Sequence, residues 1–282
     1  INFCYHDKLL RDNPAKAKAD RQGRGFSEDN PYAFQYHYYN NTQPENIAFM
    51  AEIRAVMNKY PEVVALGEIS SEDSLQTMAE YTQGDDRLHM AYSFELLTPE
   101  GSPQYIRNTV EALEDKLSDG WPCWAIGNHD VTRVASRWGN SSNNAAQSKM
   151  FNAMLASLRG SICSYQGEEL GLTEANIDFN DLQDPYGINF WPTFKGRDGC
   201  RTPMPWQSTQ LNGGFTSSKK PWLPVFDDHC QVAVDMQMAQ PDSVLTAYRS
   251  FLYWRKTQPT LQYGEIKFVE SDDDKLIFIR SC

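Results

Sequence analysis

The chain has 282 residues, 40% of them hydrophobic and 22% charged, a balance typical of globular proteins with a large buried core. Its formal net charge of −11 argues against nucleic acid or an anionic membrane surface as a partner. No apolar run approaches the roughly 18 residues of a membrane span, so we expect no membrane partner. The six cysteines are scattered without CxxC spacing, which favours a reducing compartment, and we expect a cytoplasmic protein.

The hydrophobic pattern predicts helices and strands that alternate along the chain. A long loop over 13–39, rich in glycine, proline, asparagine and aromatic residues, comes first. Apolar residues at intervals of three and four predict helices over 46–60, 73–81, 104–117, 145–158 and 243–256. Short apolar runs predict strands over 63–66, 89–97, 123–127 and 161–165. This alternation predicts an α/β fold with a parallel sheet.

Two later segments break the alternation. A long irregular insertion is expected from about 171 to 241, before the last helix. After Pro259, two short strands over 264–270 and 275–280 flank Asp272-Asp273-Asp274 and predict a hairpin. We therefore expect one large domain over 1–258, with the insertion inside it, and the beginning of a separate all-β domain over 259–282.

Acidic side chains stand near the carboxyl ends of two predicted strands. The run over 63–70 is expected to be a fully buried parallel strand, and Glu68 lies near its end. Asp130, preceded by Asn128 and His129, follows the strand over 123–127. Because parallel α/β folds bind ligands at the carboxyl ends of their strands, these groups are expected to meet at one rim. Carboxylates that converge have separated pKa values, which is what glycoside hydrolysis requires.

Other interpretations of these residues stay open on spacing alone. Glu68, His129 and Asp130 are also a plausible set of metal ligands, or an ion-pair cluster that serves the fold. Taken singly, Glu68 could cap the next helix or pair with an arginine. His129 could be a core histidine whose ring nitrogens are hydrogen-bonded.

Four ordered motifs resemble the α-amylase superfamily, glycoside hydrolase family 13, and most closely its α-glucosidase and oligo-1,6-glucosidase branch. They are Gly67-Glu68-Ile69, Ala125–Asp130, Tyr165–Gly171 and Arg197–Trp206. Ile1-Asn2-Phe3 resembles the tail of a further motif, and Gln183-Asp184-Pro185 resembles a family segment near the mouth of the active site, to which we assign no role. That family has a (β/α)₈ TIM barrel followed by a β domain. The resemblance implies that this chain is the C-terminal half of such a barrel, strands five to eight, followed by the start of an all-β C-terminal domain.

The resemblance also implies roles for individual residues. Glu68 is expected to be the general acid/base and Asp130 the carboxylate that stabilises the transition state. His129 and Asn128 are expected to bind the substrate beside Asp130, and Arg197 to bind the glucose at the non-reducing end. A salt bridge to an acid of a loop is the alternative interpretation of Arg197. Phe94 is expected to form an aromatic wall on the aglycone side, although plain packing would explain it almost equally well.

These roles predict a retaining α-glucosidase that removes terminal α-linked glucose, α-1,4 or α-1,6, from short oligosaccharides, with transglycosylation as a side reaction. The family's nucleophile would lie two positions before Ile1, so we expect this chain alone to be inactive. The alternatives are a trehalose- or isomaltulose-forming transferase or isomerase, or a non-catalytic relative of transporter subunits. We expect no cofactor and no metal at the site; a structural calcium site would lie upstream. The expected partner is a small α-glucoside, and the oligomeric state stays open.

Overall fold

The structure is a computed structural model that describes residues 2–21, 28–140, 144–272 and 274–282. The chain divides into two compact units. Unit 1 comprises Ile1–Ala125, Arg159–Cys163 and Tyr263–Cys282, and unit 2 comprises Ile126–Leu158 and Ser164–Gln262. Each unit is described by itself.

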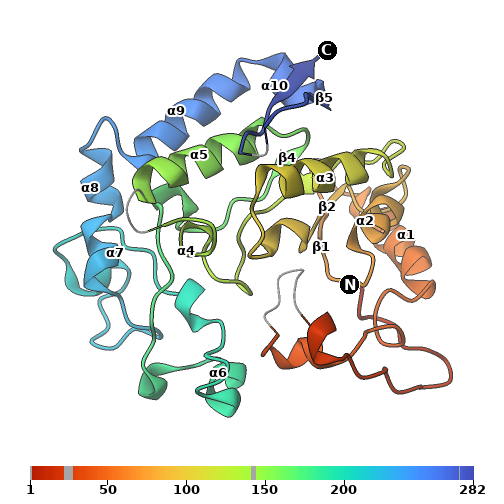
Figure 1. Cartoon of the computed structure of the whole chain (residues 1–282), viewed down its shortest axis with the longest axis horizontal. Coiled ribbons are helices and arrows are strands. Elements are labelled where there is room, and N and C mark those ends of the chain that lie inside the picture. The colour runs from red at the N-terminus through yellow and green to blue at the C-terminus, as the bar shows by residue number, and fades with distance from the viewer. Residues whose placement is uncertain (1, 22–27, 141–143, 273) are drawn as a thin grey trace. The chain divides into compact units, whose positions relative to one another are not determined.

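The centre of unit 1 is a set of short parallel strands that follow one another in sequence order (Figure 1). Strand β1 (Leu66–Ile69) pairs in parallel with β2 (Met90–Ser93), and β3 (Cys123–Trp124) pairs in parallel with β4 (Ser161–Ile162). A parallel bridge between Ala91 and Pro122 connects the two pairs. Neighbouring parallel strands in sequence order, with a helix in each crossover, are the repeating unit of an α/β barrel.

Helices fill the connections between these strands. Helix α2 (Ser74–Thr82) connects β1 to β2 and α3 (Pro103–Glu114) connects β2 to β3, whereas α1 (Glu45–Met57) precedes β1. Asp73 caps the start of α2, because its carboxylate accepts a hydrogen bond from the Gln76 amide, and the Ser102 hydroxyl caps α3 by accepting one from the Tyr105 amide. Helix α3 buries its apolar face through Ile106, Val110 and Leu113. These elements confirm the β/α alternation that the hydrophobic pattern predicts.

The strands predicted over 89–97, 123–127 and 161–165 contain the observed ones and extend beyond them, whereas the strand predicted over 63–66 is observed three residues later, at Leu66–Ile69. Strand β1 begins at Leu66, and Val63 and Val64 before it are 42% and 57% exposed, so the expectation of a fully buried run is wrong there. The reason is pairing, because a strand extends only as far as its partner, and Leu66 already faces the first residue of β2. Strand β2 likewise ends at Ser93, and the chain turns at Phe94 into a short 3₁₀ helix, Glu95–Leu97.

Unit 2 is mainly helical. Its two long helices are α5 (Asn144–Ser157) and α9 (Val244–Lys256), and its short ones are α4 (Val134–Arg137), α6 (Pro185–Phe190), α7 (Asp227–Gln231) and α8 (Val234–Met238). Helix α9 begins with a capping box between Ser243 and Thr246. Leu170, Leu172 and Leu245 form a buried apolar cluster.

A part of the predicted irregular insertion forms short helices, α6, α7 and α8, and the remainder is mostly irregular as expected. Pattern analysis missed them because a helix of five or six residues is too short to show an apolar period. Six further segments form single turns of 3₁₀ helix: Lys18–Asp20, Pro31–Phe34, Glu168–Leu170, Phe179–Asp181, Asp198–Cys200 and Leu211–Gly214.

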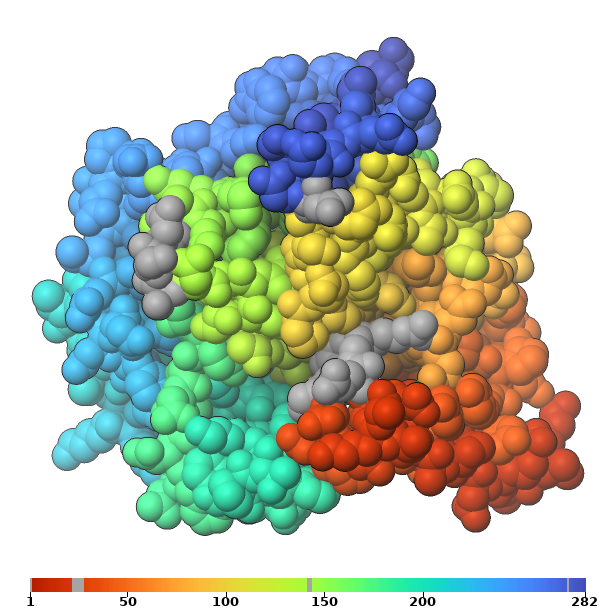
Figure 2. Space-filling view, viewed as in Figure 1, coloured from red at the N-terminus to blue at the C-terminus, as the bar shows by residue number. Residues whose placement is uncertain are grey.

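The end of the chain forms the predicted hairpin. Helix α10 (Pro259–Tyr263) leads into β5 (Glu265–Phe268), which pairs antiparallel with β6 (Phe278–Ser281). Figure 2 shows this segment, in dark blue, against helix α3, in yellow, where Arg107 Nη1 donates to the Val269 carbonyl at 3.4 Å. Asp273, in the predicted turn, lies outside the described residues. The domain boundary at 258/259 stays a prediction. Within the described ranges, no helix combines the length and apolar character that crossing a membrane requires.

Candidate active site

Glu68 is the third residue of β1 in unit 1, and the strand holds it by its geometry. Its neighbours Gly67 and Ile69 are buried, so the alternation of a strand turns the half-buried Glu68 the other way. Tyr92 faces Glu68 directly across the β1–β2 pair, and its hydroxyl donates a hydrogen bond to Glu68 Oε1. A cross-strand tyrosine thus fixes the direction of the carboxylate.

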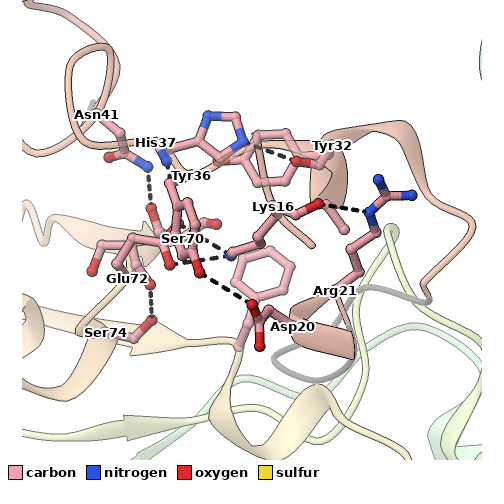
Figure 3. Close-up of a pocket in the computed structure, with 13 residues that line it drawn as sticks. Lys16, Asp20, Arg21, Tyr32, Tyr36, His37, Asn41, Ser70, Glu72 and Ser74 are labelled. Atoms are coloured by element: carbon pink, nitrogen blue, oxygen red, sulfur yellow. Dashed lines mark hydrogen bonds and ion pairs between the residues drawn. The ribbon is translucent and has the colours of Figure 1, made fainter. Parts of the chain in front are cut away.

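A cavity of about 260 Å³ lies in unit 1 just beyond the carboxyl end of β1 (Figure 3). Ser70, Ser71 and Glu72 of the segment after β1 line it, and the loop predicted over 13–39 supplies much of the opposite wall. Lys16 Nζ lies 3.1 Å from Glu72 Oε2 and 4.7 Å from the centre of the Tyr36 ring.

Aromatic rings complete this cavity. Tyr32 stacks on His37 with ring centres 3.9 Å apart, and His37 Nε2 lies 2.9 Å from the Tyr32 carbonyl oxygen. Phe94 lines the cavity and is only 3% exposed. Its ring therefore packs in the core and also forms part of the cavity wall. Ring faces beside fixed charged groups suit a ligand that has both C–H faces and hydroxyls.

Asp130 belongs to unit 2 and lies in the loop that precedes α4. Its Oδ1 accepts hydrogen bonds from Arg197 Nη1 at 2.8 Å and from Arg201 Nη2 at 3.0 Å. His129 Nε2 lies 3.7 Å from Asp130 Oδ2, and the His129 side chain is 52% exposed. The structure therefore brings His129, Asp130 and Arg197 together, as the resemblance implies.

A second acid, Asp184, anchors Arg197. The Arg197 side chain donates from Nε to Asp184 Oδ2 at 2.9 Å and from Nη2 to Oδ1 at 3.0 Å, a bidentate pair, and Asp184 is completely buried. Burial alone would raise the pKa of Asp184, but the hydrogen bonds and charge of Arg197 outweigh it and the pKa is lowered. The same hydrogen bonds raise the pKa of Arg197. Both groups therefore stay charged at neutral pH.

The backbone of the Asp130 loop is held by polar side chains. Asn128 Oδ1 accepts a hydrogen bond from the Asp130 amide at 2.9 Å, and Arg201 Nε donates to the His129 carbonyl at 2.7 Å. Asn128 is only 4% exposed. Its observed contact thus supports the loop, and its predicted contact with substrate stays a prediction.

Two residues of this cluster were missed by pattern analysis. Asp184 lies in the Gln183-Asp184-Pro185 segment, and Arg201 lies four residues after Arg197 in the same motif. Their motifs were the available signal, but a motif does not say which carboxylate pairs with which guanidinium. Glu68 and Phe94 belong to unit 1, whereas Asn128, His129, Asp130 and Arg197 belong to unit 2.

The fold and the site together define a protein of the α/β-barrel class. Its strands are parallel with helical crossovers, one carboxylate lies at a strand end, and another lies in a loop and is held by arginine. Comparison with known families agrees. The model of the alpha amylase catalytic domain matches residues 8–264. The chain therefore belongs to the alpha-amylase family.

Individual relatives include glucosidases of this family. The chain is 48% identical to a probable alpha-glucosidase of Rhizobium meliloti, over 100% of this chain and 51% of that protein. It is 30% identical to an oligo-1,6-glucosidase of Heyndrickxia coagulans, over 84% of this chain and 49% of that protein. The chain spans about half the length of the curated relatives it matches.

Solved structures confirm the fold. The crystal structure of the alpha-glucosyl transfer enzyme XgtA superposes with a TM-score of 0.94 at 59% identity, over 100% of this chain and 52% of that one. The isomaltulose synthase of Erwinia rhapontici NX5 superposes with a TM-score of 0.72 at 23% identity, over 82% of this chain and 47% of that one, and shows the fold alone. The predicted fold class, the second half of a (β/α)₈ barrel, is thereby confirmed.

Proposed function

We propose that the gene product carrying this chain is a retaining α-glucosidase that releases terminal α-linked glucose from short oligosaccharides. The observation that carries this proposal is the Asp130 cluster: a carboxylate held by two guanidinium groups beside a half-exposed histidine. Such a cluster can bind vicinal hydroxyls of a sugar and stabilise positive charge that develops on its ring. The identity of 48% with a probable alpha-glucosidase supports it.

In this proposal Glu68 is the general acid/base. Its protonated form donates a proton to the leaving glycosidic oxygen, and its ionised form later accepts a proton from the attacking water. The hydrogen bond from Tyr92 keeps the carboxyl group in one direction during both steps. The nucleophile of a retaining reaction is assigned to no residue of this chain.

Asp130 and His129 act on the sugar in the transition state. Hydrogen bonds from the sugar hydroxyls to Asp130 strengthen as positive charge develops at the anomeric carbon. The bidentate pair with Asp184 fixes the guanidinium of Arg197. The hydrogen bond from Arg197 Nη1 then holds the Asp130 carboxylate in one orientation toward the sugar. The cavity of unit 1, with Phe94 in its wall, is proposed to receive the part of the substrate beyond the scissile bond.

Glucosyl transfer is a second candidate. The alpha-glucosyl transfer enzyme XgtA, at 59% identity and a TM-score of 0.94, supports this candidate. A retaining glucosidase becomes a transferase when a sugar or alcohol takes the place of water in the second step, and the same residues serve both reactions.

The gene product should be incubated separately with maltose, isomaltose, sucrose and trehalose, and all products identified. Release of glucose from maltose or isomaltose supports the glucosidase, and the preferred disaccharide gives the linkage. Products longer than the substrate support transfer. Absence of any product from all four sugars would contradict both, and would favour a non-catalytic relative.

A further inference from the structure

We propose that Arg137 and Glu168 are positioning residues that hold the loop carrying Asp130 from its buried side. This inference rests on the proposed function, because it assigns these residues an effect on catalysis through Asp130. Both residues and the whole loop belong to unit 2. Neither residue was assigned a role in substrate binding by the motifs.

Arg137 ties the two ends of the loop together. It is the last residue of α4, and its guanidinium donates from Nη2 to the Ile126 carbonyl and from Nη1 to the Thr132 carbonyl. These two carbonyls flank the segment 127–131, which includes His129 and Asp130. One planar group with donors on both sides therefore sets the distance between the start and the end of the loop, a task that the point charge of lysine performs less well.

Glu168 supports the start of the same loop. Its Oε2 accepts hydrogen bonds from Ser164 Oγ at 3.1 Å and from the Tyr165 amide at 3.0 Å, so the carboxyl group is fixed. Its Oε1 has no hydrogen-bond partner among the described residues, and the residue is only 6% exposed. A Cβ atom on Gly127 would lie 2.4 Å from this oxygen. The loop backbone thus packs directly on Glu168, and a side chain at 127 would force the fixed carboxyl group to shift.

Arg137 is a partly buried cation, and the ionised forms of two nearby glutamates favour its charge. Burial lowers the pKa of Arg137 to about 10, and the negative charges of Glu168 and Glu174 oppose that shift. Glu174 in turn accepts a hydrogen bond from the Arg133 amide at 2.8 Å, one residue beyond the loop. Ionisable groups are costly to bury, and apolar residues of similar volume would pack as well. What the polar groups add is directional hydrogen bonding, and the hydrogen bonds of Arg137 hold the backbone of the loop in one conformation.

A shift of the loop would move Asp130 relative to the arginines that hold it. A displacement of about 1 Å at a reacting group costs on the order of a hundredfold in rate, even when the cause lies elsewhere. We therefore expect Arg137→Lys and Glu168→Gln to lower kcat by roughly tenfold to a hundredfold, with KM changed by less than about threefold.

A double-mutant cycle in the gene product tests the inference. Arg137→Lys and Glu168→Gln are each measured alone and in combination with Asp130→Asn. If the two residues act through Asp130, each change has little further effect on kcat once Asp130 is replaced. Losses that multiply in the double variants would show an independent, merely structural effect and would overturn the inference.

The matched controls are Arg159→Lys and Glu114→Gln, which alter a partly buried ion pair of 3.1 Å in unit 1. They are expected to lower the melting temperature and to leave kcat unchanged. Should Glu168→Gln fail to fold, Gly127→Ala tests the same contact from the loop, with the same expected loss of kcat. Failure of the proposed function is distinguishable: it shows as normal turnover of Asp130→Asn. If Asp130→Asn loses its turnover while Arg137→Lys and Glu168→Gln keep the parent kcat, only the present inference is overturned.

Discussion

Arg197 and Asp184 form a bidentate ion pair, with Nε and Nη2 of Arg197 at 2.9 and 3.0 Å from the two carboxylate oxygens, while Nη1 remains directed at Asp130. The Asp184 side chain is completely buried, whereas the Arg197 side chain is 25% exposed. Through Arg197, Asp184 thereby sets the geometry of Asp130, an acid that the substrate is proposed to contact.

Replacing Asp184 by asparagine should weaken substrate binding and stability together. Removing one partner of a fully buried ion pair costs about 3–5 kcal/mol. A smaller cost is expected here, because Arg197 is 25% exposed and keeps its ion pair with Asp130. We expect KM to rise by at least about tenfold and the melting temperature to fall by several degrees. Kinetics and calorimetry of the gene product measure both.

The control for this change is Asp242→Asn. Asp242 also pairs with a cation, Lys149 at 2.8 Å, but its side chain is 99% exposed. The melting temperature and KM should both stay at the parent values. Equal effects of Asp184→Asn and Asp242→Asn would contradict the anchoring role.

Replacing Glu68 by glutamine should remove proton transfer and leave the strand intact. Turnover should fall by at least about a hundredfold, because glutamine neither donates nor accepts the proton. Tyr92→Phe removes only the hydrogen bond that directs Glu68, and a loss of about tenfold is expected. Steady-state turnover on the preferred disaccharide measures both effects. Glu80→Gln on α2 is the control, and near-normal turnover of Glu68→Gln would end its assignment.

Stability should fall as the pH rises toward neutrality, because of the buried glutamates. Burial raises the pKa of Glu168 to about 7, and that of Glu174 likewise to about 7. Between about pH 4.5 and 7 the folded chain therefore keeps protons that the unfolded chain has lost, and its stability decreases through that window. For the fully buried Glu168 the loss is on the order of 3 kcal/mol.

Thermal melting at pH 5 and pH 7.5 measures this effect. The parent protein should melt at a lower temperature at pH 7.5, and Glu168→Gln, which carries no titrating group at this position, should show a smaller difference. A difference of the same size in parent and variant would mean that Glu168 ionises at its ordinary pKa.

The cavity in unit 1 should contribute to binding and not to chemistry. Lys16→Met removes the ammonium group that lies between Glu72 and the ring of Tyr36. KM should rise by roughly fivefold to tenfold at nearly unchanged kcat, the pattern of lost uniform binding. Lys18→Met is the control, because that side chain is 72% exposed. Unchanged KM in Lys16→Met would exclude this cavity from the substrate path.

The sequence by itself determined the β/α alternation, the placing of Glu68 near the end of one strand and of Asp130 after another, and the family motifs. Those properties are local, since periodicity and capping residues such as Asp73 act within a few positions. Only the tertiary structure decided where each strand ends, because Val63 and Val64 have β-forming side chains but no partner strand. It also selected Asp184 and Arg201 as partners in the Asp130 cluster, and Arg137 and Glu168 as supports of its loop. Contacts between residues far apart in the chain depend on distances that no local pattern contains.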